Sequence, residues 1–442
     1  MSTTLQTVRI VDLSGISRDM AARIRAGQQE AAKVWMACRD ELHRCIAERC
    51  KWPGPLELHF LTKGRFALHS QSIQQVCRAF LGNVESTRER RKDGNKDIRY
   101  PYRDKAFYPL MWPKQAVAIQ GNRVILPMGR GRASIVFEKP EWLESPAACK
   151  IIWNRTHYEA HFSVELPKPA RVESSVHATV DLGEIHQCAV TTNDGYGLIV
   201  SGRGIRSEKR RKNKMHAELS RLLSRCNKGS RRWKRLRKRR NVLAARIERR
   251  IRDLRHKGTR QVIEFCKAHE VSRLFIGNPH GVRNRRCGRK HNQRMSQWEY
   301  GKDIDYLTHK SAQAGISCFT GSERGTSSRC PRCGHRHKPQ GRNWVCAQCG
   351  FRGHRDLVGS LNMHALAFDE RPMFPAAHAI TYLRPGTAFN ALPVRSSRPD
   401  TGHAKGMLPH GAEDLSQPRV PNARRRASDG SKSSESVGSP LL

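Results

Sequence analysis

The sequence predicts a multidomain α/β protein, with a β-rich N-terminal part holding helical insertions and a C-terminal strand-and-helix part interrupted by a cysteine cluster. Three features of the sequence predict this fold class. Some segments alternate apolar and polar residues with the period of two typical of strands, and others repeat apolar residues at helical spacing. Four cysteines form two C-x-x-C pairs. The length of 442 residues is enough for two or three domains.

The charge of the chain indicates a polyanionic partner. There are 82 Lys and Arg against 39 Asp and Glu, a formal net charge of +43. A compact fold with this excess repels itself unless a polyanion neutralises it, and nucleic acid is the natural one because each contacted phosphate releases counterions. We expect no membrane partner, since the chain has no apolar run of about 18 residues. The first residues, MSTTLQTVRIVDLS, also lack the pattern of a signal peptide, so we expect a cytoplasmic, nucleoid-associated prokaryotic protein.

The N-terminal third alternates between helical and strand patterns. Residues 1–14 alternate weakly, as a strand would, and residues 18–49 and 71–91 carry apolar residues at helical spacing. Between about 100 and 168, segments such as AVAIQGNRVILPM and HYEAHFSVEL show period-two alternation, with a turn at Gly121 and Asn122 in the first. We therefore predict helices set into a β-rich module over residues 1–170.

The C-terminal part begins with strand patterns in residues 176–203, followed by a long, basic helical stretch at 207–268. Residues 201–260 contain 25 Lys and Arg against 4 Asp and Glu, and acidic partners at i+4 spacing are nearly absent. Such a stretch is usually a solvated surface, but this charge density favours contact with nucleic-acid phosphates. The next predicted elements are a strand, a helix, a strand and, after the cysteines, a helix, at 274–278, 295–314, 316–321 and 356–367. The Pro-, Ser-, Arg- and Gly-rich tail at 371–442 is predicted to be disordered.

The cysteine cluster is typical of a structural zinc site. The segment CPRCGHRHKPQGRNWVCAQCG places one pair of thiols in each of two short turns, and tetrahedral zinc needs four such ligands. Gly334 and Gly350 follow the second cysteine of each pair, where the turn needs a permissive backbone. The alternative is redox-active or unrelated cysteines. We predict that the four zinc ligands are Cys330, Cys333, Cys346 and Cys349.

Three acidic residues stand out in this basic chain. Asp181 lies in an apolar strand pattern, Glu323 follows the strand pattern ISCFTG, and Asp356 begins the last predicted helix. Each has a plain structural alternative: Asp181 as a turn cap, Glu323 as a surface loop residue and Asp356 as a helix N-cap. Hydrolysis of a phosphodiester with two Mg²⁺ ions requires several converging carboxylates, which is the functional interpretation of the set.

These motifs occur in an order that resembles TnpB, the nuclease encoded by insertion sequences, and the related compact type V CRISPR effectors. The order is D-L-G on a strand, a long basic helical region, T-S-x-x-C-P-x-C-G, a second C-x-x-C-G, and then R-D-x-x-G-S-x-N, over roughly residues 176–367. The resemblance implies a RuvC-like nuclease of RNase H fold that is interrupted by a zinc ribbon, preceded by a β-rich wedge module with an inserted helical recognition part. The implied boundaries are 1–170 for the wedge and recognition module, 171–320 and 353–370 for the nuclease, and 321–352 for the zinc ribbon.

The resemblance also implies roles for individual residues. Asp181 matches the first catalytic aspartate of the family, Asp356 the last one and Asn362 the asparagine on the same helix. This chain has His354-Arg355-Asp356 where the family often has Asp-Arg-Asp.

One position departs from the family pattern. The middle glutamate of the family usually ends the strand that reads LFIGN here, but Gly277 and Asn278 stand at that place. Either catalysis is lost, or Glu323 supplies the acid from the next strand, as in some relatives. Neighbouring strands lie about 4.8 Å apart, so an adjacent strand can bring a carboxylate close to the vacated position. We predict that Asp181, Glu323 and Asp356 are catalytic and hold two Mg²⁺ ions.

The function implied is RNA-guided, Mg²⁺-dependent cleavage of double-stranded DNA in the service of a mobile element or a CRISPR array, with guide RNA and duplex target as partners. The first alternative is an inactive RNA-guided DNA-binding protein, such as a repressor. The others are a zinc-ribbon nucleic-acid-binding protein without a guide, and a DDE-type transposase, which the position of the ribbon within the acidic set disfavours.

Overall fold

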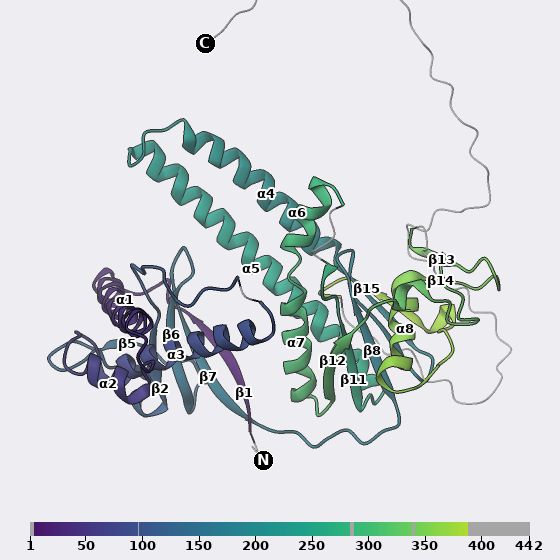
Figure 1. The fold of residues 1–442 in the computed structure, drawn as a ribbon, viewed down its shortest axis with the longest axis horizontal. Helices are drawn as coiled ribbons and strands as arrows, with labels where there is room; N and C mark the ends of the chain where they lie inside the picture. The colour runs from purple at the N-terminus through teal and green to yellow at the C-terminus, as the bar shows by residue number, and fades with distance from the viewer. Residues whose placement is uncertain (1–3, 96, 283–286, 338–340, 388–442) are drawn as a thin grey trace, which may run out of the picture. The chain divides into compact units, whose positions relative to one another are not determined.

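The computed structural model describes residues 4–95, 97–282, 287–337 and 341–387, and Figure 1 traces the fold. In the N-terminal part, an antiparallel sheet has the strand order β1-β7-β6-β2, with the bounds Thr4–Asp12, Tyr158–Pro167, Pro146–Trp153 and Leu110–Pro113. A smaller antiparallel sheet follows a 3-10 turn and contains β3, β4 and β5, with the bounds Ala118–Gln120, Arg123–Leu126 and Ile135–Glu138. The predicted turn at Gly121 joins β3 to β4, with a left-handed φ of 55°.

Three helices share one apolar core with these sheets: α1 (Arg18–Ala47), α2 (Pro55–Thr62) and α3 (Ser70–Lys92). The hydroxyl of Ser17 caps α1 by accepting a hydrogen bond from the amide of Met20 at 3.1 Å. Trp35 of α1 packs edge-on against Phe80 of α3, with ring centroids 5.1 Å apart. The helices predicted at 18–49 and 71–91 are confirmed. The short α2 was not predicted, because a segment of 8 residues shows too little periodicity.

The C-terminal part is built on a six-stranded sheet with the strand order β12-β11-β8-β9-β10-β15. Strands β8 (His177–Leu182), β9 (His186–Thr192) and β10 (Gly197–Ser201) form an antiparallel meander. Strands β11 (Arg273–Asn278) and β12 (Ser317–Ser322) run parallel to β8. This order and these directions are those of the RNase H fold, and the predicted fold class is therefore confirmed.

Helices cover both faces of this sheet (Figure 1). The helices on one face are α5 (Arg231–Ala268) and α7 (Tyr300–Gln313), and α8 (Arg355–Ala367) packs on the other. Alternate residues of β8 face opposite ways. Val180 packs in the apolar core with α5 and α7, whereas Thr179 contacts α8. Asp181, two residues further on, therefore faces α8 as well.

The predicted basic helical stretch is two antiparallel helices, α4 (Arg203–Ser224) and α5, which lie side by side (Figure 1). The turn between them contains Gly229 at a φ of 90°, and the hydroxyl of Ser230 accepts a hydrogen bond from the amide of Trp233 to begin α5. The helix predicted at 295–314 is also divided, into α6 (Arg289–Gln297) and α7. Among the described residues, no helix combines the length and apolarity needed to cross a bilayer.

The cysteine-containing segment lies between β12 and α8. It contains a 3-10 turn at Thr326–Ser328 (η3) and the antiparallel pair β13 (Asn343–Val345) and β14 (Arg352–His354). Part of the segment predicted as a disordered tail differs from that prediction. A short strand, β15 (Ile380–Leu383), follows a 3-10 turn and pairs in parallel with β10, because four residues suffice to extend an existing sheet edge. The remainder of that tail, 388–442, lies outside the described residues.

Candidate active site

The site lies at one edge of the six-stranded sheet, where three parallel strands end. Asp181 is the fifth residue of β8, Asn278 is the last residue of β11, and Glu323 directly follows β12. The carboxyl ends of parallel strands meet at the same edge, and ligands of open α/β sheets bind outside such ends. All three side chains line one cavity of about 910 Å³.

Helix α8 brings the third acid to the same cavity. Asp356 is in its first turn and lines the cavity with Asp181 and Glu323. The helix approaches β8 closely, since a Cβ atom added at Gly359 would lie 2.6 Å from Oδ2 of Asp181. A larger residue at 359 would therefore displace Asp181. The structure brings together the three acids predicted from the sequence.

Glu323 occupies the position that the family pattern assigns to the side chain of residue 277. Gly277 pairs with Gly321 in the parallel ladder of β11 and β12, and Glu323 lies two residues beyond that pair. A Cβ atom added at Gly277 would lie 2.5 Å from Oε2 of Glu323. The carboxylate of Glu323 thus extends from the end of β12 to the space over Gly277 on the neighbouring strand β11.

Two of the acids have raised pKa values, and burial is the main cause for both. Burial, together with the negative charges of Glu323 and Asp356, raises the pKa of Asp181 well above its usual value. Burial raises the pKa of Glu323 to about 7. Such shifts are expected where several carboxyl groups share a low-dielectric cavity.

Asp356 differs from the other two acids because cationic and hydrogen-bonding partners surround it. Burial alone would raise its pKa, but the hydrogen bond to His186 and the charge of Arg342 lower the pKa below the usual value. Nδ1 of His186 lies 2.8 Å from Oδ2 of Asp356. Nη1 of Arg342 donates to Oδ1 at 2.8 Å and to Oδ2 at 2.6 Å.

Sequence reasoning did not place two residues that the structure brings to this site, His186 and Arg342, and it assigned no role there to Asn278 or His354. The ring of His354 lies beside that of His186, with centroids 4.9 Å apart. Burial lowers the pKa of His354 to about 4, so its imidazole is neutral at physiological pH. The sequence signals were the departure from Asp-Arg-Asp at 354–356 for His354 and the departure from the family pattern at 277–278 for Asn278.

The donor atoms in the cavity fit divalent cations. Among the described residues, Oε2 of Glu323 and Oδ1 of Asn278 are buried oxygens without a hydrogen-bond partner. Buried carboxylate and amide oxygens left without partners are costly, and they are the ligands that hard cations prefer. The residues present therefore suit cations bound between the three acids.

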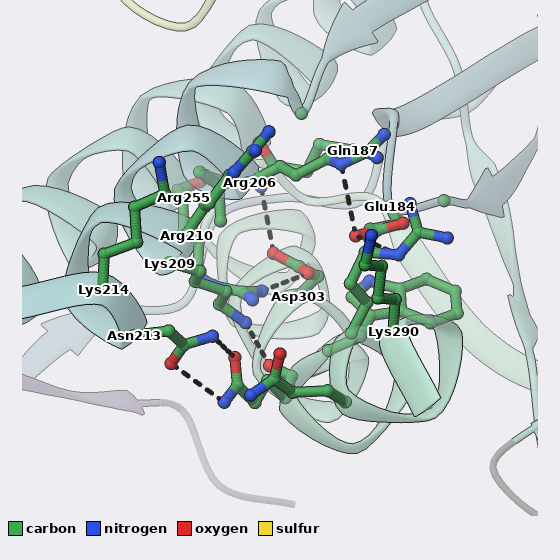
Figure 2. Close-up of a pocket in the computed structure, with 17 residues that line it drawn as sticks. Glu184, Gln187, Arg206, Lys209, Arg210, Asn213, Lys214, Arg255, Lys290 and Asp303 are labelled. Atoms are coloured by element: carbon green, nitrogen blue, oxygen red, sulfur yellow. Dashed lines mark hydrogen bonds and ion pairs between the residues drawn. The ribbon is translucent and has the colours of Figure 1, made fainter. Parts of the chain in front are cut away.

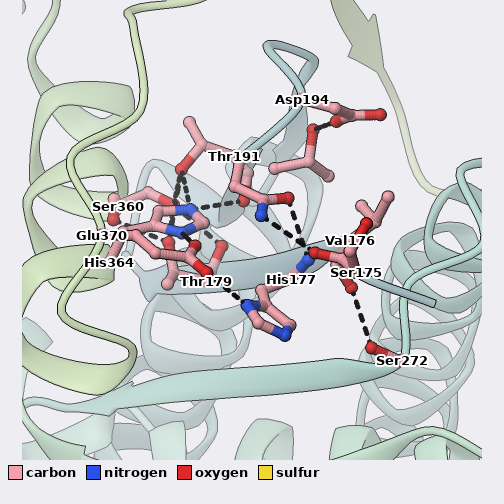
Figure 3. Close-up of polar contacts among 12 residues, drawn as sticks. Ser175, Val176, His177, Thr179, Thr191, Asp194, Ser272, Ser360, His364 and Glu370 are labelled. Carbon is pink, nitrogen blue, oxygen red and sulfur yellow. Dashed lines mark hydrogen bonds and ion pairs between the residues drawn. The ribbon is translucent and has the colours of Figure 1, made fainter. Parts of the chain in front are cut away.

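A buried polar network fastens α8 to the strands of the site (Figure 3). The hydroxyl of Thr179 donates to the carbonyl of Ser360 at 2.6 Å, and the hydroxyl of Ser360 can donate to the carbonyl of Thr179 at 2.8 Å. The hydroxyl of Thr191 lies 2.9 Å from that of Ser360, and all three side chains are fully buried. Because Thr179 precedes Asp181 by two residues and Ser360 follows Asp356 by four, this network fixes the two acids relative to each other.

The four predicted cysteine ligands converge. The sulfur of Cys330 lies 3.6 Å from that of Cys349, and that of Cys333 lies 3.5 Å from that of Cys346. Four thiolates about 2.3 Å from a tetrahedral zinc ion are about 3.8 Å apart, so the arrangement suits a metal ion. Gly334 and Gly350 have left-handed φ values of 74° and 68°, as the predicted turns require.

The cysteine segment is tied to α8 and to the loop after Glu323. Trp344 is fully buried and belongs to a small core with two of the cysteines and Val358 of α8. The side-chain amide of Asn362, on α8, donates to the carbonyls of Thr326 at 2.7 Å and Arg329 at 2.8 Å. Asn362 therefore holds the loop that joins Glu323 to the first cysteine turn, which gives this residue a structural role.

A second, strongly basic pocket of about 580 Å³ lies between α4, α6 and α7 (Figure 2). At its base, the guanidinium of Arg255 is paired with the carboxylate of Asp303, and both side chains are almost fully buried. Nε2 of Gln187 donates to Oδ1 of Asp303 at 2.9 Å. The cationic side chains that line the pocket are Arg206, Lys209, Arg210, Lys214, Arg255, Lys290 and Arg294.

Comparisons with known proteins agree with this architecture. Residues 161–283 match the family model described as OrfB_IS605, probable transposase, and residues 300–363 match the model described as Cas12f1-like, TNB domain. No curated protein matches the chain significantly.

The fold is similar to that of one solved Cas12f1 complex. The structure described as the Cas12f1–sgRNA–target DNA complex aligns with a TM-score of 0.53 at 13% identity, covering 78% of this chain and 83% of that one. The structure described as the mini-RNA-guided endonuclease CRISPR-Cas_phi3 aligns with a TM-score of 0.48 at 10% identity, covering 84% and 94%. The two family-model matches and the shared fold confirm the resemblance to TnpB and the compact type V effectors that the sequence predicted.

Proposed function

We propose that this protein is an RNA-guided DNA endonuclease that hydrolyses phosphodiester bonds with divalent cations held by Asp181, Glu323 and Asp356. The observation that carries the proposal is the place of Glu323. Its Oε2 atom lies 2.5 Å from where a Cβ atom at Gly277 would be, which supports Glu323, directly after β12, as the replacement for the acid missing from β11. Three carboxylates then line one cavity, which is the ligand number that two-metal hydrolysis needs.

The side chains of the cavity would have different roles in the reaction. Asp181 on β8 and Glu323 directly after β12 would hold Mg²⁺ together with Asp356 on α8. Bound Mg²⁺ supplies electrophilic stabilisation of the phosphate and a more acidic water. His186 orients the carboxylate of Asp356 through a 2.8 Å contact. Thr179 and Ser360 hold α8 against β8, so the acids are already in position before a cation arrives.

The basic helices α4 and α5 are the proposed contact surface for guide RNA and target DNA. The protein in the first solved structure above is described in complex with guide RNA and target DNA, and a similar partner set is proposed for this chain. Base pairing with the guide would select the sequence, while cationic side chains would contact phosphates regardless of sequence. The charge excess of residues 201–260 supports this assignment.

The cysteine cluster is proposed to hold zinc in a structural role. All four ligand positions are filled by thiols, which leaves no open position for a substrate. The ion would fix the turns around Cys330 and Cys346, and through Trp344 and Val358 it would stabilise the start of α8.

The test is a cleavage assay with the full-length protein and the RNA that co-purifies with it. Sequencing this RNA defines the guide, and a DNA library with a matching target and a randomised flank is then incubated with Mg²⁺. We expect cut DNA from the wild type and none from Asp181→Asn. Asp194→Asn is a matched control, because Asp194 lies in the exposed β9–β10 turn at the opposite sheet edge and should leave cleavage unchanged.

Two outcomes would replace the proposal. Guide-dependent binding without cleavage would favour a repressor-like protein. Absence of an enriched small RNA would favour a zinc-ribbon nucleic-acid-binding protein that uses no guide.

A further inference from the structure

Two histidines and one carboxylate come together beside the three acids. Nδ1 of His186 lies 2.8 Å from Oδ2 of Asp356, and the rings of His186 and His354 are 4.9 Å apart. One donor atom from each of the three side chains lies within 4.8 Å of the others, close enough for a single metal ion. The side chains of His186 and Asp356 are only 12% and 15% exposed, so the donors are partly shielded from water.

Three separate elements bring these donors together. His186 is the first residue of β9, His354 is the last residue of β14 in the cysteine segment, and Asp356 lies in the first turn of α8. His354 also caps α8, since its Nδ1 accepts a hydrogen bond from the amide of Asp356 at 3.3 Å. The sheet thus places His186, and the junction of β14 with α8 places His354 and Asp356 together opposite it.

The donor set differs from the oxygen-only ligands of a magnesium site. Mg²⁺ is held by carboxylates, phosphates and water, whereas imidazole favours first-row transition-metal ions. We propose that His186 and His354 join Asp356 as ligands of one active-site cation, which makes this position selective for a first-row transition-metal dication over Mg²⁺. The inference rests on the proposed function in so far as Asp356 belongs to both sites.

Arg342 is a cationic side chain that pairs with this same carboxylate. Its guanidinium contacts both oxygens of Asp356, at 2.8 Å and 2.6 Å, and its side chain is 42% exposed. The positive charge of Arg342 therefore occupies the position beside Asp356 that a bound metal ion would take. Because the guanidinium is partly exposed, it can move into solvent when the cation binds. Arg342 therefore competes with the metal, and its removal should raise the affinity of the site.

The competing explanation is that His186 only orients Asp356 through a hydrogen bond and that His354 only caps α8. Under this explanation, a cation at Asp356 would have oxygen ligands alone. Nitrogen coordination separates the two cases directly, and it can be measured without any nucleic acid.

The experiment uses full-length, zinc-loaded protein and Mn²⁺ as the probe, because Mn²⁺ is paramagnetic and does not displace zinc from four thiolates. Pulsed electron paramagnetic resonance should show ¹⁴N coupling from directly bound imidazole. The double variant His186→Asn, His354→Asp should lose this coupling. Its preference for Mn²⁺ over Mg²⁺, measured by competition titration, should fall by about tenfold or more, which corresponds to about 1.4 kcal/mol.

Two further variants sharpen the result. Arg342→Gln should bind Mn²⁺ more tightly than the wild type, since the competing cation is gone. His309→Asn is the matched control, because His309 is exposed on α7, which packs on the opposite face of the sheet from α8. It should leave both the coupling and the preference unchanged. A circular dichroism melt of each variant shows that the fold is retained.

The outcomes distinguish this inference from the proposed function. Mn²⁺ binding without ¹⁴N coupling, or an unchanged metal preference in the double variant, overturns the inference even if guided cleavage is observed. Nitrogen coupling in a protein that cuts no guided target with either ion supports the inference and overturns the proposed endonuclease.

Discussion

The carboxylate of Glu323 fills the space that a side chain at Gly277 would need. A Cβ atom at residue 277 would lie 2.5 Å from Oε2 of Glu323, closer than real Cβ atoms come to other heavy atoms. Gly277 is in β11, Glu323 directly follows the neighbouring parallel strand β12, and the two strands pair through Gly277 and Gly321. Gly277 and Glu323 therefore depend on each other. A side chain at residue 277 would clash with Glu323, and loss of the acid at 323 would remove a proposed ligand.

This arrangement predicts that a glutamate at residue 277 can replace Glu323 in the site. Glu323→Gln should reduce guided cleavage at least about 100-fold, because a metal ligand contributes several kcal/mol and each ~1.4 kcal/mol is tenfold in rate. Gly277→Glu combined with Glu323→Ala should recover part of the loss. The nearest neighbour of the added Cβ atom is then the flexible end of the Met363 side chain, with Sδ at 2.7 Å.

Single-turnover cleavage of a matched target measures both variants. Gly277→Glu alone should be impaired, because two carboxylates then compete for one space. Full activity of Glu323→Gln would remove this residue from the site.

The raised pKa of Glu323 predicts how stability depends on pH. Without added divalent cations, the folded protein holds a proton on Glu323 up to about pH 7, whereas the unfolded chain releases it near 4.5. The folded state thus binds more protons between these values, so its free energy of unfolding falls as the pH rises from about 4.5 to 7. Asp181 acts in the same direction because its pKa is also raised.

Thermal denaturation at several pH values, without Mg²⁺, measures this slope. Glu323→Gln should flatten it, and added Mg²⁺ should stabilise the wild type most at the upper end of the range, where the ligands are ionised. A wild-type slope of the opposite sign that persists in Glu323→Gln would contradict the electrostatic account of the cavity.

Loss of zinc should disturb the active site as well as the cysteine segment. Cys346→Ser removes one ligand, and we expect less than one zinc ion per chain by atomic emission. Faster proteolysis between residues 324 and 353 should accompany it, since structural zinc contributes directly to folding. Cleavage should fall too, because Asn362 contacts the loop that joins Glu323 to Cys330.

Cys287→Ser is the matched control, because Cys287 is exposed and lies outside the cluster. Its zinc content and proteolysis pattern should match the wild type. A full zinc complement in Cys346→Ser would show that the ion is held elsewhere.

The polar network under α8 predicts that removing one of its hydroxyls lowers both the stability of the fold and the rate of cleavage. Ser360→Ala removes the buried hydroxyl that lies between Thr179 and Thr191 and donates to the carbonyl of Thr179, and the loss of these hydrogen bonds costs about 1–3 kcal/mol. The variant should melt earlier and cut more slowly, since α8 no longer holds Asp356 in place. Ser328→Ala is a suitable control because its hydroxyl contacts only a local carbonyl, that of Gly325. Equal effects of the two substitutions would contradict the assigned role of the network.

The exposed cations of α5 should set the salt dependence of RNA binding. Replacing Lys234, Arg235, Lys238 and Arg239 by Gln should weaken guide binding and reduce the slope of log K against log salt by about one for each phosphate that is no longer neutralised. Filter binding at several salt concentrations measures this slope. Replacement of four exposed cations of α3, Arg78, Arg90, Arg91 and Lys92, provides a charge-matched comparison. An unchanged slope for the α5 variant would place the guide elsewhere.

Local patterns in the sequence were sufficient for the long helices and several of the strands, but not for the short α2 or for the breaks between α4 and α5 and between α6 and α7. Helix α1 follows from its apolar spacing, and β8 from a short apolar run. The same patterns missed β15, because a strand of four residues is stabilised by its neighbour β10 and not by its own sequence.

The sequence by itself determined the paired cysteine cluster and the excess of positive charge, because spacing and residue type are local properties of the chain, and the order of its motifs singled out the three acids as candidates. Only the tertiary structure decided that Glu323 reaches the space over Gly277, and that His186 and Arg342 meet Asp356. These contacts join residues from different strands and from the cysteine segment. Their distances depend on strand order and helix packing, which no single segment of the sequence encodes.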